Sequence, residues 1–292
     1  MHERILAQRT DFARAVPIAQ NRIMTTATSS STPEPARPVG DPLDLFRLDG
    51  RVAVVTGASS GLGERFARVL HAVGAQLVVT ARRADRLEAL AADLPGTLVV
   101  PADLSLAEGR ERVVEATLER FGRIDVLVNN AGVGHKVAVE DETLDEFRFT
   151  MEVNVSAVWH LSKLAAPSMI ANGGGSIVNI ASMLGHVGAS PVKQAHYCAS
   201  KGAVVNLTRE LGAQWGRKGV RVNALCPGWF PSEMTAGMES DEGSLRFIAS
   251  NSPIPRMGRH HELDAALLLL AGPGSTFMTG QSVIVDGGWT AR

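Results

Sequence analysis

A short apolar run that leads through a glycine-rich turn into a helical pattern most constrains the fold of this chain. Residues 51–56 read Arg-Val-Ala-Val-Val-Thr, a continuous β-branched run that is typical of a strand buried on both faces of a parallel sheet. Glycines follow at 57, 61 and 63, and apolar residues then recur at helical spacing up to Gly74. Such glycines also make ordinary turns. Between a strand and a helix, however, they let the backbone approach a pyrophosphate, whose charge the helix N-terminus stabilises. We therefore predict a nucleotide site at Gly57, Ser59, Ser60, Gly61, Leu62 and Gly63.

The rest of the chain repeats this alternation of strands and helices. Six further apolar runs predict strands at 76–80, 97–101, 125–129, 175–182, 220–225 and 282–285. Helical patterns cover 107–121, 144–170 and 262–271. A chain of 292 residues with 45% hydrophobic content can bury one substantial core. The sequence thus predicts one α/β domain over residues 46–292.

Residues 1–45 do not follow this pattern. The stretch 25–41 is rich in Ser, Thr and Pro, which predicts a disordered N-terminal arm at 1–45. Residues 1–24 lack the apolar core of a signal peptide, although a transit peptide remains an alternative. Met24 lies just before the Ser/Thr/Pro-rich stretch and is an alternative initiator.

Composition narrows the partners and the compartment. A net charge of −1 gives no electrostatic basis for binding nucleic acid or an anionic membrane. The apolar runs are shorter than the ~18–20 residues that a membrane span needs. The two cysteines, Cys198 and Cys226, form neither a CxxC motif nor a metal-ligand spacing. We expect a cytoplasmic protein with free thiols, no bound metal and a small-molecule substrate.

The end of the second strand indicates the cofactor. Arg82 and Arg83 lie about twenty residues after the glycine turn, where an NAD site presents an acidic residue to the ribose 2′-hydroxyl. A guanidinium binds a 2′-phosphate well and a bare hydroxyl poorly. NADP(H) is therefore favoured, with NAD(H) possible, although a solvated arginine pair is the alternative. Asp103, after the third strand, can accept from an adenine amine, and the small residues at 130–132 keep a groove open beside the cofactor.

Tyr197, the only tyrosine of the chain, is a candidate acid/base group. Lys201 lies four residues later on a predicted helix, so both side chains share one face. A free phenol titrates near pH ~10, and a nearby cation favours the phenolate and lowers that pKa toward the working range. An ordinary exposed helix surface is the alternative explanation of this pair.

Two more polar residues stand at informative positions. Ser182 ends the fifth strand and points to the crevice where open α/β sheets bind ligands. Asn154 lies inside an apolar helical pattern, where an asparagine is disfavoured unless its amide is used. A satisfied buried amide that bends the helix is the alternative. The segment 228–255 has no strong periodicity and reads as a substrate lid or an irregular surface excursion.

Five ordered motifs together give the chain, from about residue 46 to its end, a clear family resemblance. The motifs are Thr56-Gly57-x-x-x-Gly61-x-Gly63, Asn129-Asn130-Ala131-Gly132, Ser182, Tyr197-x-x-x-Lys201 and Pro227-Gly228. In this order they resemble the short-chain dehydrogenase/reductase family, in its small single-domain form. The resemblance implies a Rossmann-type doubly wound parallel sheet of about seven strands with helices on both faces. The fifteen residues from Ser182 to Tyr197 are slightly more than is common, which affects the expected shape of the substrate loop.

The resemblance also implies roles. Tyr197 would exchange a proton with the substrate oxygen, Ser182 would hydrogen-bond that oxygen, and Lys201 would lower the Tyr197 pKa. Asn154 would hold a water that connects Lys201 to solvent. Family members form tetramers or dimers through the helices that carry Asn154 and Tyr197, so a homo-oligomer, here a homotetramer, is expected. The cofactor would further contact Leu104, Asn130, Ala131, Gly132, Tyr197, Lys201, Pro227 and Gly228.

The substrate is less well defined by the sequence. The pocket residues expected from the loops after the fourth, fifth and sixth strands are apolar to mildly polar, which favours a neutral ketone or secondary alcohol. A 3-oxoacyl carrier-protein reductase, an NAD-dependent alcohol or sugar dehydrogenase, and a non-catalytic NADP(H)-binding sensor are the alternatives. These expected pocket residues are His135, Met183, His186, Gln194, His196, Trp229 and Phe230.

Overall fold

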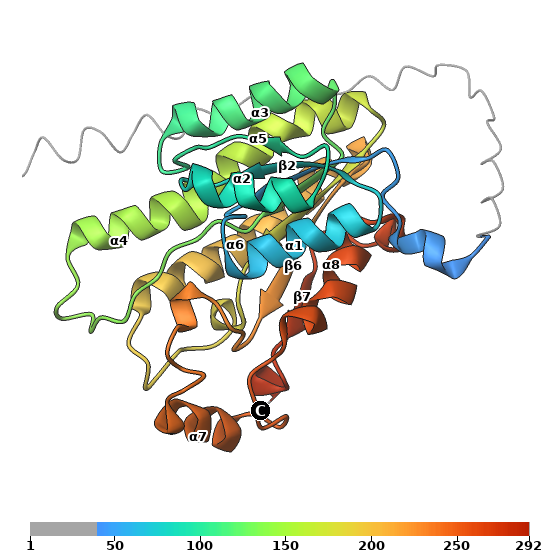
Figure 1. The fold of residues 1–292 in the computed structure, drawn as a ribbon. Coiled ribbons are helices and arrows are strands. Elements are labelled where there is room, and N and C mark those ends of the chain that lie inside the picture. Colours follow the sequence, from blue (N-terminus) through green and yellow to red (C-terminus); the bar gives the residue numbers. More distant parts are fainter. Residues whose placement is uncertain (1–39, 292) are drawn as a thin grey trace, which may run out of the picture. The chain divides into compact units, whose positions relative to one another are not determined.

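The computed structural model describes residues 40–291 and contains the expected parallel sheet of seven strands (Figure 1). Neighbouring strands are all parallel, in the order β3-β2-β1-β4-β5-β6-β7. The chain builds outward from β1 on one side and from β4 on the other. The strand order therefore reverses between β1 and β4, which is where open α/β sheets bind ligands. The strands are β1 (Val52–Thr56), β2 (Gln76–Thr80), β3 (Leu98–Val99), β4 (Val126–Asn129), β5 (Gly175–Ile180), β6 (Val220–Pro227) and β7 (Ser282–Val285).

Helices cover both faces of the sheet, as the doubly wound fold requires. One buried core contains residues of α1 (Gly61–Ala72), α2 (Ala84–Asp93) and α8 (Asp264–Ala271). A second core contains residues of α3 (Ala107–Phe121), α5 (Ala157–Ala171) and α6 (Ala195–Trp215). Within β1, Ala53 and Val55 belong to the first core, whereas Val52 and Val54 belong to the second. Because successive side chains of a strand point to opposite faces, both faces of the run must be apolar.

The helix expected at 144–170 is interrupted. It consists of α4 (Leu144–Met151), a π-helical segment η3 (Glu152–Ser156) and α5. Thr143 starts α4 with a capping box, in which its hydroxyl accepts from the Glu146 backbone N–H at 3.2 Å. The π-helical turn contains Asn154. Single π-turns within α-helices frequently mark functional sites.

The segment after β6 is more regular than its sequence indicates. It contains η6 (Glu233–Thr235) and α7 (Glu242–Asn251), where no element was predicted. Asp241 caps α7 by accepting from the Ser244 backbone N–H at 2.7 Å. Only Ile248 of this helix is buried, so the helix leaves almost no apolar period in the sequence. Figure 1 shows α7 beside the C-terminal end of the chain.

The described part begins slightly before the expected domain boundary at residue 46. Residues 40–45 are described, and Pro42–Phe46 form the short helix η2, capped by Asp41 through the Leu43 backbone N–H at 2.9 Å. The remaining residues of the expected arm, 1–39, lie outside the described residues. Among residues 40–291, no helix is long and apolar enough to cross a membrane.

Candidate active site

A cavity of about 630 Å³ opens at the carboxyl ends of the strands. The glycine turn after β1 and the ends of β2, β4, β5 and β6 all contribute to its wall. Every residue that the sequence assigned to cofactor binding lines this one cavity, and Ser182 lines it as well. The cofactor-assigned residues are Gly57, Ser59, Ser60, Gly61, Leu62, Gly63, Arg82, Arg83, Asp103, Leu104, Asn130, Ala131, Gly132, Tyr197, Lys201, Pro227 and Gly228.

The glycine turn brings backbone atoms together more closely than side chains would allow. Gly57 has φ +66°, and a Cβ there would lie 2.8 Å from the Ala131 Cα. A Cβ on Gly63 would lie 2.2 Å from the Gly57 carbonyl oxygen. The turn therefore folds tightly onto the start of α1. Ser60 occupies the N-cap of α1 but makes no side-chain cap bond, so the terminal N–H groups remain suited to an anionic ligand such as a pyrophosphate.

Hydrogen bonds join the loops after β1 and β4, the two strands between which the strand order reverses. The Thr56 hydroxyl accepts from the backbone N–H groups of Asn130 and Ala131, both at 2.9 Å. The Asn130 amide donates in return to the Thr56 carbonyl at 2.9 Å. The loops after β1 and β4 therefore hold each other in place, and the groove between them is largely preformed.

Arg83 lies at the centre of a polar cluster beside the glycine turn. We call this part of the cavity the cofactor side. The Arg83 guanidinium donates to the Ser60 hydroxyl at 2.9 Å, and it also bonds Ser59. It donates to both oxygens of Glu233, at 2.8 and 3.0 Å, and Arg86 donates to one of them at 2.9 Å. The pKa of Glu233 is lowered to about 2, and the hydrogen bond from Arg83 is the largest cause.

Asp103, for which the sequence predicts an adenine contact, lines the cavity. Its Oδ1 accepts from the Ser105 hydroxyl at 2.7 Å and from the Ser105 backbone N–H at 2.9 Å. These bonds lower the pKa of Asp103, so the group is a carboxylate at neutral pH. An acceptor therefore stands at the cavity wall, where an exocyclic amine could donate to it.

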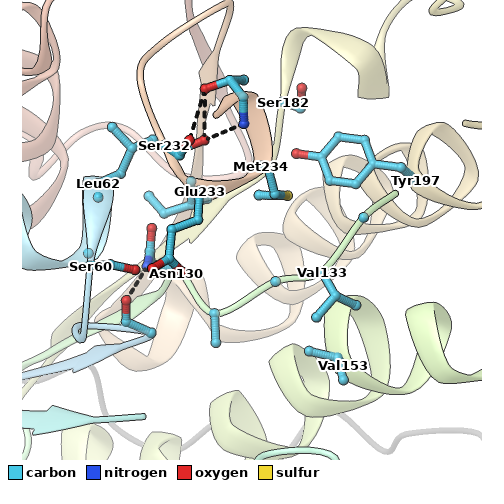
Figure 2. A pocket seen from close by; sticks show the side chains of 18 of the residues that line it. Ser60, Leu62, Asn130, Val133, Val153, Ser182, Tyr197, Ser232, Glu233 and Met234 are labelled. Carbon is cyan, nitrogen blue, oxygen red and sulfur yellow. Dashed lines mark hydrogen bonds between the residues drawn. The ribbon is translucent and has the colours of Figure 1, made fainter. Parts of the chain in front are cut away.

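Tyr197 lies on the first turn of α6 and faces the cavity. The loop after β4 passes close to its ring, because a Cβ on Gly134 would lie 2.7 Å from the Tyr197 Cδ2. Burial raises the pKa of Tyr197 to about 12, while a hydrogen bond with the Ser182 side chain acts in the opposite direction. Figure 2 shows the phenol hydroxyl directed into the pocket on the side of Ser182.

Lys201 lies one turn after Tyr197 and is 4% exposed. Its Nζ lies 5.5 Å from the centroid of the Tyr197 ring and donates to the Ile180 carbonyl at 2.8 Å. Burial lowers the pKa of Lys201 to about 8. The structure thus brings the pair together as predicted, but burial outweighs the expected lowering of the phenol pKa. The ammonium hydrogen-bonds a carbonyl and lies near the ring face, not on the phenol oxygen.

Ser182 follows β5 directly. It caps the short helix η4 (Met183–Gly185), where its hydroxyl accepts from the Leu184 backbone N–H at 3.1 Å. This bond leaves the hydroxyl proton available to another acceptor. The cap therefore fixes a donor beside the phenol of Tyr197.

Asn154 lies behind the cavity wall and does not line it. Its Oδ1 accepts from the Val133 backbone N–H, and its Nδ2 donates to the Val133 carbonyl, both at 2.8 Å. Nδ2 also donates to the Ser200 hydroxyl at 3.0 Å. The amide thus fastens the loop after β4 to α6. A Cβ on Gly132 would lie 3.3 Å from the Asn154 oxygen and 3.5 Å from the Lys201 Nζ, so both groups approach the same glycine.

Two of the expected pocket residues are absent from the cavity wall. His186 lies beside Cys226, with 3.6 Å between Nε2 and Sγ, and His196 is fully buried. His196 Nδ1 instead lies 2.6 Å from a Glu142 carboxylate oxygen. His135, which does line the cavity, stacks on the His196 ring with a centroid separation of 4.3 Å. Nitrogen and oxygen atoms of His135, Glu142 and His196 that could bind a metal ion lie within 4.8 Å of one another. However, the two stacked histidine rings do not direct their lone pairs at one point.

The sequence did not indicate several other residues of the wall. Glu233 is the most consequential, because it reaches the cofactor side from the segment after β6. No local pattern could reveal it, since its partner Arg83 is 150 residues away. The other residues that line the cavity without having been predicted include Ser105, Lys136, Phe149, Val153, Leu184, Val192, Ser232, Met234, Thr235 and Met238.

Comparison with known proteins agrees with this geometry. Residues 57–290 match a family profile described as Enoyl-(Acyl carrier protein) reductase. The chain is 38% identical to galactitol 2-dehydrogenase (L-tagatose-forming) of Cereibacter sphaeroides over 84% of this chain and 97% of the relative. It is 36% identical to gluconate 5-dehydrogenase of Gluconobacter oxydans over 85% of this chain and 97% of the relative.

A solved structure shows the same architecture. The crystal structure of a gluconate 5-dehydrogenase from Burkholderia cenocepacia, in complex with NADP and tartrate, superposes with a TM-score of 0.81 at 33% identity. The match covers 86% of this chain and all of that chain, at 100%. Most of this chain therefore has a structural counterpart in a protein whose crystal structure contains NADP.

Proposed function

The chain belongs to the short-chain dehydrogenase/reductase family, and on that premise we propose that its substrate is a sugar or polyol. The protein is an oxidoreductase that transfers a hydride between NADP(H) and a secondary alcohol or ketone. The observation that carries the proposal is one cavity that holds both halves of this chemistry. The glycine turn and Arg83 lie on one side of it, and Tyr197 and Ser182 lie on the other.

The residues of the cavity fit NADP(H). The uncapped N-terminus of α1 suits the pyrophosphate, and Asp103 offers an acceptor for the adenine. Arg83 and the hydroxyls of Ser59 and Ser60 form a donor set that suits a phosphate on the ribose. When bound, NADP(H) supplies or accepts the hydride, which is chemistry that no side chain of the chain provides.

Tyr197 and Ser182 handle the substrate oxygen in this proposal. During reduction, the Tyr197 hydroxyl gives its proton to the carbonyl oxygen as that oxygen becomes an alkoxide. Ser182, whose oxygen already accepts from Leu184, donates its hydroxyl proton to the same oxygen and stabilises the developing charge. During oxidation the proton moves in the opposite direction, from the alcohol to the phenolate.

Lys201 and Asn154 support the phenol. The Lys201 ammonium places a positive charge near the Tyr197 ring, which favours the phenolate form whenever the lysine is protonated. Asn154 holds Val133 and Ser200 in place and so fixes the loop beside Tyr197. In our proposal it also positions a water between Lys201 and solvent, which returns protons to the site.

The names of the relatives and the polarity of the wall support a hydroxyl-rich substrate. Galactitol and gluconate, named for two relatives, are chains of secondary alcohols. Around Tyr197 the wall offers the polar side chains of His135, Lys136 and Gln194 beside apolar Met183 and Trp229. Such a substrate needs several hydrogen-bond partners next to one short apolar contact surface.

We further propose a cytoplasmic homotetramer. Leu144, Phe149 and Trp159, on α4 and α5, are 61%, 46% and 46% exposed, and such apolar residues favour contacts with another copy of the chain. Cys198 and Cys226 are free thiols, which suits a reducing compartment. Light scattering on the purified chain tests the assembly: any mass other than that of four chains would contradict it.

One experiment tests the proposed function. Purified protein is assayed with NADP⁺ against galactitol, gluconate and a simple secondary alcohol, and the same assays are run on Tyr197→Phe. We expect a preference for a polyol or sugar acid, and a loss of about 10²- to 10⁴-fold in turnover for Tyr197→Phe. NADPH binding, followed by nicotinamide fluorescence, should remain nearly unchanged, because the phenol hydroxyl is small and the ring stays. Turnover of Tyr197→Phe at the wild-type rate would overturn the mechanism.

A further inference from the structure

The cluster on the cofactor side contains an anion that the chain itself supplies. Three further residues bond to the pair of Arg83 and Glu233. The hydroxyls of Ser59 and Ser60, in the glycine turn, accept from Arg83. Arg86, on α2, donates to Glu233. Glu233 enters the cluster from η6, in the segment after β6. Its two carboxylate oxygens accept from the two terminal nitrogens of Arg83. A guanidinium binds a phosphate in the same bidentate geometry.

We infer that Glu233 occupies the place of the 2′-phosphate and competes with it, so that this residue tunes the preference between NADP(H) and NAD(H). The inference rests on the proposed use of NADP(H) by this cavity. A carboxylate and a phosphate dianion cannot share the same guanidinium donors without strong repulsion between like charges. A cofactor that carries the phosphate must therefore displace Glu233, whereas one that lacks it leaves the Arg83–Glu233 pair intact.

The displacement connects the cofactor side to the substrate side. Ser232, directly before Glu233, approaches the glycine turn, because a Cβ on Gly61 would lie 3.7 Å from the Ser232 Cα. Met234, directly after it, and Met238, five residues after it, line the cavity. Figure 2 shows the Glu233 side chain reaching toward Ser60 while Met234 lies on the side of Tyr197. Release of Glu233 by the phosphate thus removes one contact that holds the segment with Met234 and Met238 against the cavity.

The size of the effect follows from exposure. The side chains of Arg83 and Glu233 are 39% and 56% exposed, so solvent screens their attraction. Exposed ion pairs contribute little each, and three such bonds correspond to roughly three- to tenfold in binding. Glu233 therefore adjusts the cofactor ratio without abolishing either mode of binding.

The test uses the full chain and two probes that lack nicotinamide, 2′,5′-ADP and 5′-AMP, with binding measured by calorimetry. We expect Glu233→Gln to bind 2′,5′-ADP about three- to tenfold more tightly than wild type and to bind 5′-AMP within twofold of wild type. Glu242→Gln is the matched control. It removes the same charge from α7, where Glu242 is 87% exposed, and should bind both probes as wild type does. An unchanged or weaker affinity of Glu233→Gln for 2′,5′-ADP, or an equal gain for both probes, would overturn the inference.

A second measurement reports on the segment itself. In wild type, 2′,5′-ADP should speed amide hydrogen exchange at residues 232–240, whereas 5′-AMP should not. In Glu233→Gln, exchange there should already be fast without a probe. Slower exchange in wild type on adding 2′,5′-ADP would show that Glu233 stays in place and would contradict the competition. Failure of wild type to bind either probe would instead contradict the proposed function.

Discussion

At the scale of single residues, the most unusual group is the buried ammonium of Lys201. It is 4% exposed, and it donates a hydrogen bond to the Ile180 carbonyl at 2.8 Å. Burial lowers its pKa from 10.5 to about 8, so at neutral pH the fold carries a charge in an unfavourable place. A group that weakens the folded state and lies beside the phenol of Tyr197, the acid/base group of our proposal, is better explained by catalysis than by packing.

This charge leads to a prediction about stability. Lys201→Met should raise the free energy of unfolding at pH 7 by about 2 kcal/mol, because a lowering of the pKa by about 2.5 units costs about 3 kcal/mol and the lost hydrogen bond returns about 1. The folded pKa of Lys201 lies below the unfolded one, so the cost is complete below pH 8 and disappears by about pH 10.5. The advantage of Lys201→Met should therefore shrink over that interval. Urea unfolding at pH 7, 9 and 10.5 measures it, and a less stable variant at pH 7 would contradict the prediction.

A second prediction concerns the pH dependence of reduction. Above pH 8 the lysine loses its proton, and the phenol of Tyr197, whose pKa burial already raises to about 12, becomes a still poorer acid. We expect kcat/KM for NADPH, which reports on the free enzyme, to fall by up to about tenfold per pH unit above about pH 8. Lys218→Gln, which removes an exposed lysine, should keep the same break. A profile that stays flat to pH 9.5 would show that the protonation of Lys201 does not control the proton transfer.

At the scale of elements, the π-helical turn η3 decides where the active-site loop lies. By widening the helix at Asn154, it directs one amide into three hydrogen bonds, two of them to the backbone of Val133. The interruption of the helix is therefore a means of joining the loop after β4 to α6. The same loop runs close to Tyr197 at Gly134.

Asn154→Ala tests this role. It should lower turnover at least about tenfold and destabilise the fold by about 1–2 kcal/mol, because it leaves the half-buried N–H and carbonyl of Val133 without their partner. Asn172→Ala, at the exposed end of α5, removes an amide of the same type and should change neither quantity. Chemical denaturation and steady-state assays on the two variants give the comparison. Equal stability of Asn154→Ala and wild type would show that the loop is held by other contacts.

The elements also show which parts of the fold and the site were predictable from the sequence. The strands were predictable because a parallel strand between two helical layers must be apolar on both faces, as in 51–56. That the proposed cofactor residues lie together in one cavity was predictable, because a nucleotide site requires particular residue types at short, fixed spacings. α7 was missed because it buries only Ile248, and Glu233 was missed because its contact with Arg83 spans 150 residues. The pKa of Tyr197 could not be predicted either, since it depends on burial and not on the offset to Lys201.

At the scale of the whole molecule, the cavity connects most of the chain. Its wall runs from Gly57 to Met238, and it takes in the ends of β1, β2, β4, β5 and β6. These strands belong to one continuous hydrogen-bonded sheet. A ligand in the cavity therefore bonds to segments that must all unfold together, and its binding energy adds to the stability of the entire domain.

This connection gives a prediction for thermal unfolding. NADPH at 100 times its Kd should stabilise the domain by about 2.7 kcal/mol and raise the Tm by roughly 5–10 °C. 5′-AMP at an equal multiple of its own Kd should give the same rise, because the stabilisation depends on occupancy and not on the reacting group. Differential scanning fluorimetry measures both shifts. A rise confined to NADPH would indicate that the nicotinamide half alone organises the fold.

The Glu233 contact limits how this enzyme can diversify. The loops after β4 and β6 each carry residues assigned to the cofactor beside residues assigned to the substrate pocket. Glu233 adds a further link, because the segment that brings Met234 and Met238 to the cavity wall also supplies the partner of Arg83. Exchanging residues 229–251 for those of a relative, in order to acquire a new substrate, would alter the cofactor preference at the same time. Substrate range and cofactor choice are thus coupled through one segment in our proposal, and a designer who wants to separate them must begin at position 233.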